Sequence, residues 1–518
     1  MIRKFFGTII TIALVFNAGV AANATDAAPG DSYQAENTSV DASSQVLSVI
    51  SDKAGNDWTG LMRGGGGNPN HPDWTNCESL KDPSCDFRSG DQFYQGNAVL
   101  QSCSVTKSEF CISSLELAAP GGDFKPASYV GESKQTVWEA DPTINFPGGG
   151  GAALFQAPNA PTAGGQNSYA VEVTLKFNWN PGMTHFDIHE MFASVLPYRG
   201  LEDPNIRGIA GWGENAGGVC AWTQPGFCGV GQDWVPGTRA RLTFSMPNTI
   251  AGWFKGRITS PEISITAKSA GVNQVTVAAE PVAVPQLAIA QPKAEKEALL
   301  QTGMDLGTWG GPGFEEIGLQ ANSRSVAQFI ERYRSQLGDS STGKTSQWNF
   351  ATVNGGGGSD CLASSDKVLG IVTTNAMGYD GSAPSFENET LTYHVSGMHY
   401  ESDKTTLTEG TYDLVMRSDV ARCLYGFTSA PISATVSVID DKGQAKTAVT
   451  VVNEKNGWLK MAAYGFSFSN PTLNVKISQA KLPTPAAKKI SITCTKGKLV
   501  KKISGTSPKC PSGYKKKA

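Results

Sequence analysis

Short segments in which apolar and polar residues alternate recur along the chain, and the clearest spans residues 169–180. Its odd positions are apolar and most of its even positions are polar, which is the period of a strand with one buried and one solvated face. Pro181-Gly182 ends this segment, and a proline ends a similar run at residues 242–246. Charged residues are only 17% of the chain. The pattern predicts an all-β protein, mainly antiparallel β-sandwich domains.

One segment departs from the strand pattern. Apolar residues recur at helical spacing between residues 323 and 337, where Ser323 or Ser325 can cap a helix and Gly338 can end it. We therefore expect one amphipathic helix near 323–337 in an otherwise β-rich chain.

Residues 1–24 have the composition of a signal peptide. Arg3 and Lys4 precede an apolar stretch that is too short to span a bilayer comfortably, and small residues lead up to Ala24. No later segment has about 18 consecutive apolar residues. We expect cleavage after Ala24, a secreted and cell-surface-associated protein, and no transmembrane anchor in the mature chain.

Composition divides the remaining chain further. Residues 25–50 are small and polar, which predicts a flexible lead-in. Three prolines within residues 281–294 predict an extended linker. The linker would separate a β-rich domain at 51–280 from a second β-sandwich domain with one helix at 295–480. Residues 481–518 would form a further linker and a basic tail.

The ten cysteines agree with export, because an oxidising compartment favours pairing of an even number of thiols. Three neighbouring couples each have seven residues between their two cysteines, which indicates short closed loops. The predicted bridges are Cys77–Cys85, Cys103–Cys111, Cys220–Cys228, Cys361–Cys423 and Cys494–Cys510.

Motifs for catalysis are scarce. Residues 338–345 match the phosphate-binding loop pattern, but a helix precedes them and a strand-like segment follows, the reverse of what that loop requires. The chain has five histidines and no Gly-x-Ser-x-Gly motif. We expect no cofactor and favour a protein without enzymatic activity, although a glycosidase-type carboxylate pair stays open.

His185, Asp187 and His189 are the candidate metal ligands. On a strand the three side chains would share one face and could bind a metal ion. They could equally belong to a polar sheet face, and no further ligand is evident nearby. We therefore expect no metal site there.

Four aromatic residues surround the predicted Cys220–Cys228 loop. If they are exposed, their rings could stack on sugars; if they are buried, they fill a sandwich core, as most tryptophans do. Both interpretations stay open at this point. The candidates are Trp212, Trp222, Phe227 and Trp234.

Charge is distributed unevenly along the chain. The last acidic residue is Glu454, and residues 455–518 contain fourteen Lys and no Arg. Residues 1–454 hold the other 29 basic and all 46 acidic side chains, a net charge of −17. Such a basic end can attract anionic polymers or merely keep the protein soluble. The expected polymer contacts are Lys496, Lys498, Lys501, Lys502, Lys509, Lys515, Lys516 and Lys517.

The tail, with Cys494-Thr-Lys-Gly-Lys followed by Pro508-Lys-Cys-Pro-x-Gly-Tyr-Lys-Lys, resembles a C-terminal tail found on exported, mostly uncharacterised actinobacterial proteins. Residues 417–427 and Gly457-Trp-Leu are similar to the bodies of some of them. The resemblance implies export and a surface location, and it supplies no activity or catalytic residue.

Together these observations favour a secreted or cell-surface binding or structural protein of the cell envelope, retained through its basic tail. Its expected partners are an anionic cell-wall polymer or envelope surface, with glycans as a further candidate, and not nucleic acid. The alternative is an extracellular carbohydrate-binding protein or carbohydrate-active enzyme that uses the Trp-rich disulfide loop.

Overall fold

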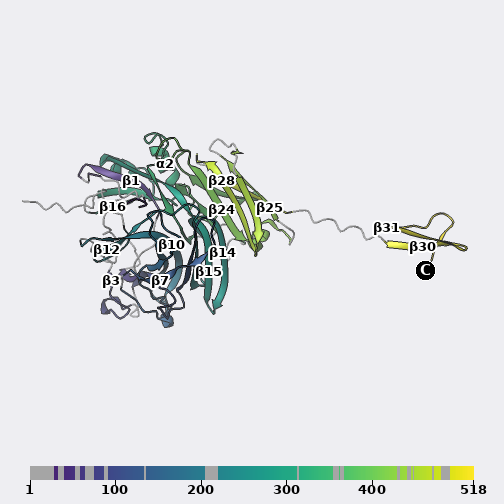
Figure 1. Cartoon of the computed structure of the whole chain (residues 1–518), viewed down its shortest axis with the longest axis horizontal. Coiled ribbons are helices and arrows are strands. Elements are labelled where there is room, and N and C mark those ends of the chain that lie inside the picture. The colour runs from purple at the N-terminus through teal and green to yellow at the C-terminus, as the bar shows by residue number, and fades with distance from the viewer. Residues whose placement is uncertain are drawn as a thin grey trace, which may run out of the picture.

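The structure is a computed structural model that describes residues 28–32, 40–41, 43–52, 59–64, 75–86, 92–133, 136–204, 220–311, 314–353, 361, 367–428, 432–439, 445–446, 449–468, 472–479 and 490–517. In these ranges the chain is mostly β, and its sheets are largely antiparallel, which confirms the all-β prediction (Figure 1). The α-helices described are α1 (Ala294–Leu300), α2 (Val326–Arg334) and α3 (Ser418–Tyr425).

One long sheet, the central sheet, crosses the body of the protein. Its main strands are β2 (Gly60–Gly64), β3 (Thr75–Cys77), β4 (Phe93–Val99), β9 (Ser168–Trp179), β10 (Asp187–Glu202), β14 (Gly252–Ser269), β19 (Asn349–Thr352), β20 (Val368–Thr374), β24 (Glu409–Arg417), β27 (Val449–Lys455) and β28 (Trp458–Ser467). They pair in the order β3-β2-β4-β9-β10-β19-β14-β20-β24-β28-β27. Every pairing is antiparallel except β14–β20.

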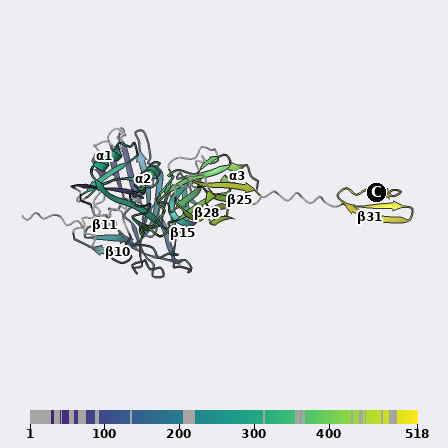
Figure 2. The ribbon, with the colours of Figure 1, turned by 90° about the horizontal axis from the view of Figure 1, so that it is seen from above.

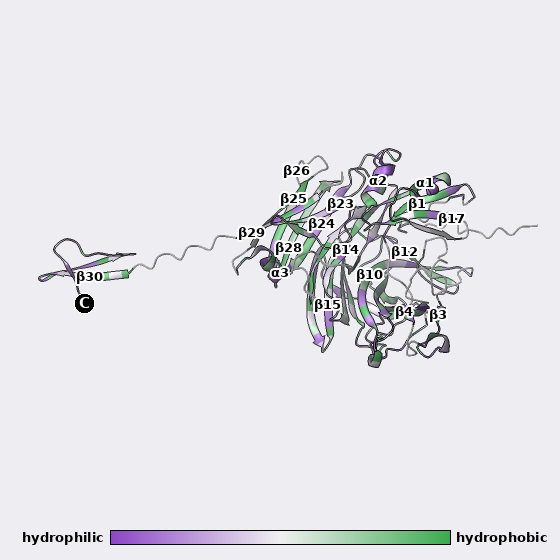
Figure 3. Ribbon diagram, turned by 180° about the vertical axis from the view of Figure 1, so that it is seen from behind, coloured by the Kyte–Doolittle hydropathy of each residue, from purple (hydrophilic) through white to green (hydrophobic). Residues whose placement is uncertain are grey.

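A second sheet covers one end of the central sheet and encloses the first core. It contains β5 (Ile112–Ala118), β13 (Arg239–Pro247) and β15 (Val272–Pro292), joined by the second half of β14. The alternating apolar residues of β9 meet those of β13 there; Val173, Phe177 and Phe244 are at most 1% exposed. Hydrophobic and hydrophilic residues alternate along β14 and β15 in Figure 3. The alternation therefore identified β9 and β13 correctly.

The outer face of β9 differs from its prediction. Its polar residues were expected to be solvated, yet Glu172 and Thr174 are each only 1% exposed. The alternation predicts which side chains share a face, and it does not reveal whether that face is covered.

A third sheet covers the other end of the central sheet and encloses the second core. Its strands are β21 (Gly378–Tyr379), β22 (Ser385–Glu387), β23 (Thr390–Ser396), β25 (Ile432–Ile439), β26 (Ala445–Lys446) and β29 (Thr472–Gln479). Side chains of β23 and β29, such as Leu391 and Leu473, pack in one buried cluster with Leu414 and Met461 of the central sheet. This two-layer packing is a β-sandwich, as predicted. Phe329 and Ile330 of α2 join the same core.

The predicted linker at 281–294 is wrong. Its residues up to Pro292 form the second half of β15, which pairs first with β18 (Gly343–Gln347) and then with β1 (Gln45–Ser51). Val284 and Leu287 in this segment are at most 1% exposed. Proline fixes an extended backbone that suits a strand as well as a linker, so composition could not distinguish the two.

The expected flexible lead-in at 25–50 is also corrected. Its last residues form β1, which lies between β15 and the parallel strand β17 (Phe314–Gln320) and is buried on both faces. β17 pairs in turn with β16 (Gly307–Gly311).

Asp31 forms a bidentate ion pair with Arg199, with N···O distances of 2.8 and 2.7 Å. Burial raises the pKa of Asp31, but the hydrogen bonds from Arg199, Ala28 and Gln232 and the charge of Arg199 together outweigh it, so the pKa is lowered. Residues 1–27, including the expected signal peptide, lie outside the described residues.

The prediction of a single helix needs adjustment. The helix near 323–337 is confirmed as α2, but the short helices α1 and α3 were not predicted, since seven or eight residues give too few turns for a clear period. The hairpin that begins with β25 extends only to β26, because β27 pairs with β28 in the facing sheet.

The remaining elements complete the fold. They are β6 (Lys125–Pro126), β7 (Ser128–Glu132), β8 (Ala153–Gln156), β11 (Cys220–Gln224), β12 (Phe227–Gly231), β30 (Ile490–Lys496), β31 (Leu499–Gly505), β32 (Lys515–Lys516) and two 3-10 turns at Pro83–Cys85 and Pro142–Ile144. All five predicted disulfides are present. Among the described helices, none has the length and hydrophobicity needed to cross a membrane.

Candidate functional site

The basic tail folds as a sheet of its own, separate from the body in Figures 1 and 2. Its strand order is β31-β30-β32, and β30 pairs antiparallel with both neighbours. Cys494, in the central strand, is bonded to Cys510, which precedes β32. We call residues 490–517 the tail sheet. The disulfide substitutes for the hydrophobic core that so short a segment cannot build.

The register of the tail sheet places lysines on both faces. Lys501 and Lys516 lie on either side of Cys494, so these three side chains share one face. Lys502 lies opposite Thr493 and Lys515 lies opposite Thr495, so both lie on the other face. Positive charge therefore surrounds this small sheet instead of forming a single stripe.

All eight lysines named in the sequence analysis are exposed. None of their ammonium groups forms an ion pair within the described part of the chain. The sequence supplies no carboxylate side chain after Glu454 that could neutralise them locally. Lys501 also lies 5.4 Å from the centroid of the Tyr514 ring. The tail sheet is a compact group of unneutralised, strongly hydrated cations.

The aromatic residues near the Cys220–Cys228 loop are packed inside the protein. Trp222 is 2% exposed and lies edge-on to Tyr198, and Trp234 is 4% exposed and lies against Tyr169. Phe227 is half-buried beside Trp222. This burial favours the core-packing interpretation, since neither indole presents a face to a sugar. Trp212 lies outside the described residues.

The candidate metal ligands do not converge. His185, Asp187 and His189 are all exposed. The His185 ring contacts the Thr184 hydroxyl, and Nδ1 of His189 lies 3.2 Å from the backbone oxygen of Asp187. Where the structure describes the chain, no group of three or more His, Cys, Asp or Glu side chains is arranged to hold a metal ion.

The segment that matches the phosphate-binding pattern has the wrong surroundings, as predicted. Helix α2 precedes it and β18 begins at Gly343. The side chain of Lys344, the lysine that would contact a phosphate, forms an ion pair with Glu401 at 2.7 Å.

A buried polar cluster on the central sheet was not predicted. Arg257 of β14 is fully buried and donates to the Asp52 carboxylate and to the backbone oxygens of Thr374, Ala376 and Met377. Its guanidinium lies 4.2 Å from the centroid of Tyr379. Two residues earlier in β14, burial lowers the pKa of Lys255. Asp52 and Arg257 are 205 residues apart, and no local pattern could relate them.

A histidine–carboxylate pair was also missed. Nδ1 of His399 lies 2.5 Å from Oδ2 of Asp339, whose other oxygen is paired with Arg334.

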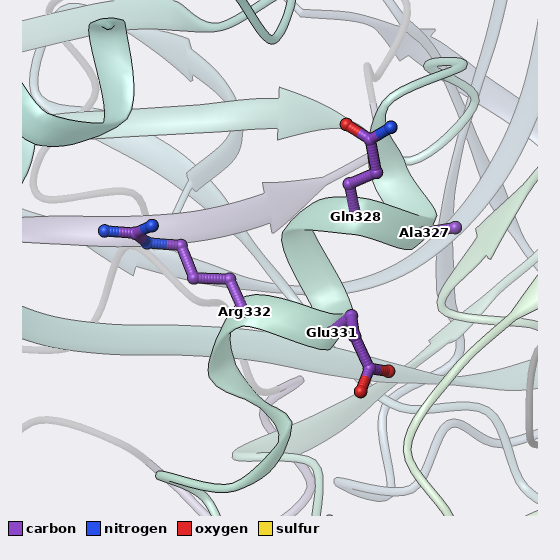
Figure 4. A pocket seen from close by; sticks show the side chains of 4 residues that line it. All are labelled: Ala327, Gln328, Glu331 and Arg332. Atoms are coloured by element: carbon purple, nitrogen blue, oxygen red, sulfur yellow. The ribbon is translucent and has the colours of Figure 1, made fainter. Parts of the chain in front are cut away.

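A shallow hollow of about 430 Å³ lies on the outer face of α2 and is lined by Ala327, Gln328, Glu331 and Arg332 (Figure 4). Both charged residues of the hollow already have partners in the fold, Arg334 and Glu295. No reactive group lines the hollow.

Comparisons with protein families, with characterised proteins and with solved structures found no match to this chain.

Proposed function

We propose that the protein is a secreted binding or structural component of the cell envelope that is retained on an anionic surface through its tail sheet. The observation that carries this proposal is the set of eight exposed lysines without a carboxylate partner on a disulfide-closed sheet. Anionic cell-wall polymers provide a surface of the required charge.

The charge of the body supports a separate attachment site. With residues 1–24 removed, residues 25–454 carry 27 basic and 46 acidic side chains, a net charge of −19. A negative surface would repel this body, so attachment depends on the lysines beyond Glu454. The Cys494–Cys510 bridge adds to the attraction because it keeps several of them close together.

The carbohydrate-binding alternative has less support. Its stacking platform required exposed indole rings, whereas Trp222 and Trp234 are buried. The described residues also show no catalytic group of side chains that would support a carbohydrate-active enzyme, and we propose no enzymatic activity.

Co-sedimentation with purified cell wall tests the proposal. We expect the full-length protein to pellet at low salt, and a chain ending at Leu482 to stay in solution. Binding of the full-length protein should fall steeply with added salt, since the Debye length shrinks from about 10 Å at 0.1 M to about 3 Å at 1 M.

A charge-matched pair of variants provides the control. One variant changes Lys501, Lys502, Lys515 and Lys516 to Gln; the other changes four exposed body lysines, Lys81, Lys107, Lys125 and Lys404, to Gln. Only the tail variant should lose binding. Equal pelleting of all variants at low and high salt would show that the tail merely keeps the protein soluble.

A further inference from the structure

The tip of the tail sheet carries apolar side chains that the charge-based proposal does not use. Leu499 and Val500 are each 62% exposed, more than any other large apolar side chain in the described residues. They begin β31, directly after the turn at Gly497 and Lys498. Nothing in the described chain packs over them.

The hairpin register places these two side chains on opposite faces of the same tip. Leu499 lies opposite Lys496, and Val500 lies opposite Thr495. Lysines occupy positions 496 and 498 before the pair and positions 501 and 502 after it. Two adjacent apolar side chains therefore project next to the turn, with Lys498 in the turn itself, Lys496 opposite Leu499, and Lys501 and Lys502 directly behind the pair.

This arrangement matches the boundary between the headgroups and the acyl chains of a lipid bilayer. Apolar side chains enter that boundary, while lysines extend their long stems and leave their ammonium groups among anionic headgroups. A hydrated wall polymer offers lysines the same negative charge, but it offers no apolar phase for Leu499 and Val500. The exposed pair thus favours a lipid surface over a polymer as the structure that the tip contacts.

We infer that the tip of the tail sheet inserts into the surface of membranes that contain anionic lipids. The inference builds on the proposed attachment through lysines and adds a second contact to it. The lysines attract any anionic surface, and the Leu499–Val500 pair adds affinity only where the surface is a bilayer.

Vesicle sedimentation with the full-length protein tests this inference. The test variant is Leu499→Thr/Val500→Thr, because threonine keeps a high strand propensity while it removes apolar surface. The matched control is Ile490→Thr, which removes a side chain of similar exposure, 54%, from the end of the hairpin far from the turn. Each protein is mixed with phosphatidylcholine vesicles, with and without phosphatidylglycerol, and separately with purified cell wall.

We expect wild type and Ile490→Thr to bind phosphatidylglycerol vesicles equally, and the double variant to bind them about tenfold more weakly, a change of about 1.4 kcal/mol. All three should bind cell wall alike, which shows that the substitutions leave the lysine-based attachment intact. Equal vesicle binding by wild type and the double variant would overturn the insertion of the tip and leave the lysine-based attachment intact. Binding of the wild-type protein to cell wall but not to vesicles would likewise overturn the insertion of the tip and leave the lysine-based attachment intact. Binding to neither would refute both proposals.

Discussion

Arg257 offers a demanding test of how the two cores are joined. It lies on β14, the strand that supplies Phe254 to the first core and Trp253 to the second. Its side chain is 0% exposed, and its only carboxylate partner in the described structure is Asp52, at 3.1 Å. Arg257→Met removes the charge and keeps the apolar stem. It leaves a largely buried carboxylate and several carbonyl oxygens without their donor.

The expected cost follows from these partners. Removing one member of a buried ion pair costs about 3–5 kcal/mol, because the remaining charge stays buried without compensation. The freed carbonyl oxygens do not add their full cost to this figure, because residues in one network are not additive. In Arg257→Met/Asp52→Asn the buried charge is gone as well, so the double variant should be more stable than the sum of the single variants predicts, by at least about 1 kcal/mol.

Guanidinium unfolding, followed by the fluorescence of the buried tryptophans, measures these changes. We expect one transition for the body that shifts to lower denaturant in Arg257→Met. Arg257→Lys should give a smaller shift, because a lysine keeps the charge but cannot reproduce the fork of donors. A loss below about 1 kcal/mol for Arg257→Met, or fully additive effects in the double variant, would refute the reasoning.

Three further predictions concern other parts of the body. Replacing both Cys361 and Cys423 by Ser should lower the free energy of unfolding by about 4 kcal/mol, because their bridge closes the longest loop, with a sequence separation of 62; denaturant unfolding measures it. Asp413→Asn should cost about 3 kcal/mol in the same assay, since the fully buried carboxylate accepts three hydrogen bonds and pairs with Lys460, whereas an amide carries no charge and its nitrogen cannot accept. The hydrogen bond to Asp380 raises the pKa of His394 above 6.5, so its stabilising contribution is complete below about pH 6.5 and is lost as pH rises through the folded-state pKa. His394→Gln should flatten that decline in stability; an unchanged pH profile would contradict the assignment.

The parts of the fold that were predictable from sequence are those determined by neighbours along the chain. A disulfide between cysteines eight positions apart can be predicted without knowledge of the fold. The bridges Cys77–Cys85, Cys103–Cys111 and Cys220–Cys228 were predicted from that spacing alone. The alternation in residues 169–180 identified β9 within one residue at each end. The exposed lysines of the tail followed from composition, because so short a segment cannot bury them.

The parts that were missed depend on distant partners. β15 runs through the predicted linker because β1 and β18, far away in sequence, complete its pairing. The same holds for β27, which joins β28 instead of extending the hairpin with β25. The burial of Trp222 likewise depends on Tyr198, on a distant strand, in addition to its chain neighbour Phe227. Hydrophobicity shows that such residues need partners, but it does not say which partners the chain brings to them.

The central claim, attachment through the lysines of the tail sheet, is tested most directly by the salt dependence of binding to purified cell wall. The apparent affinity of the full-length protein is measured at a series of salt concentrations, beside the variant with Gln at positions 501, 502, 515 and 516. Binding through lysines releases counterions from an anionic polymer, so log affinity should fall steeply with log salt, and the variant should show a clearly shallower slope. A slope near zero, or one that the four substitutions leave unchanged, would contradict the account.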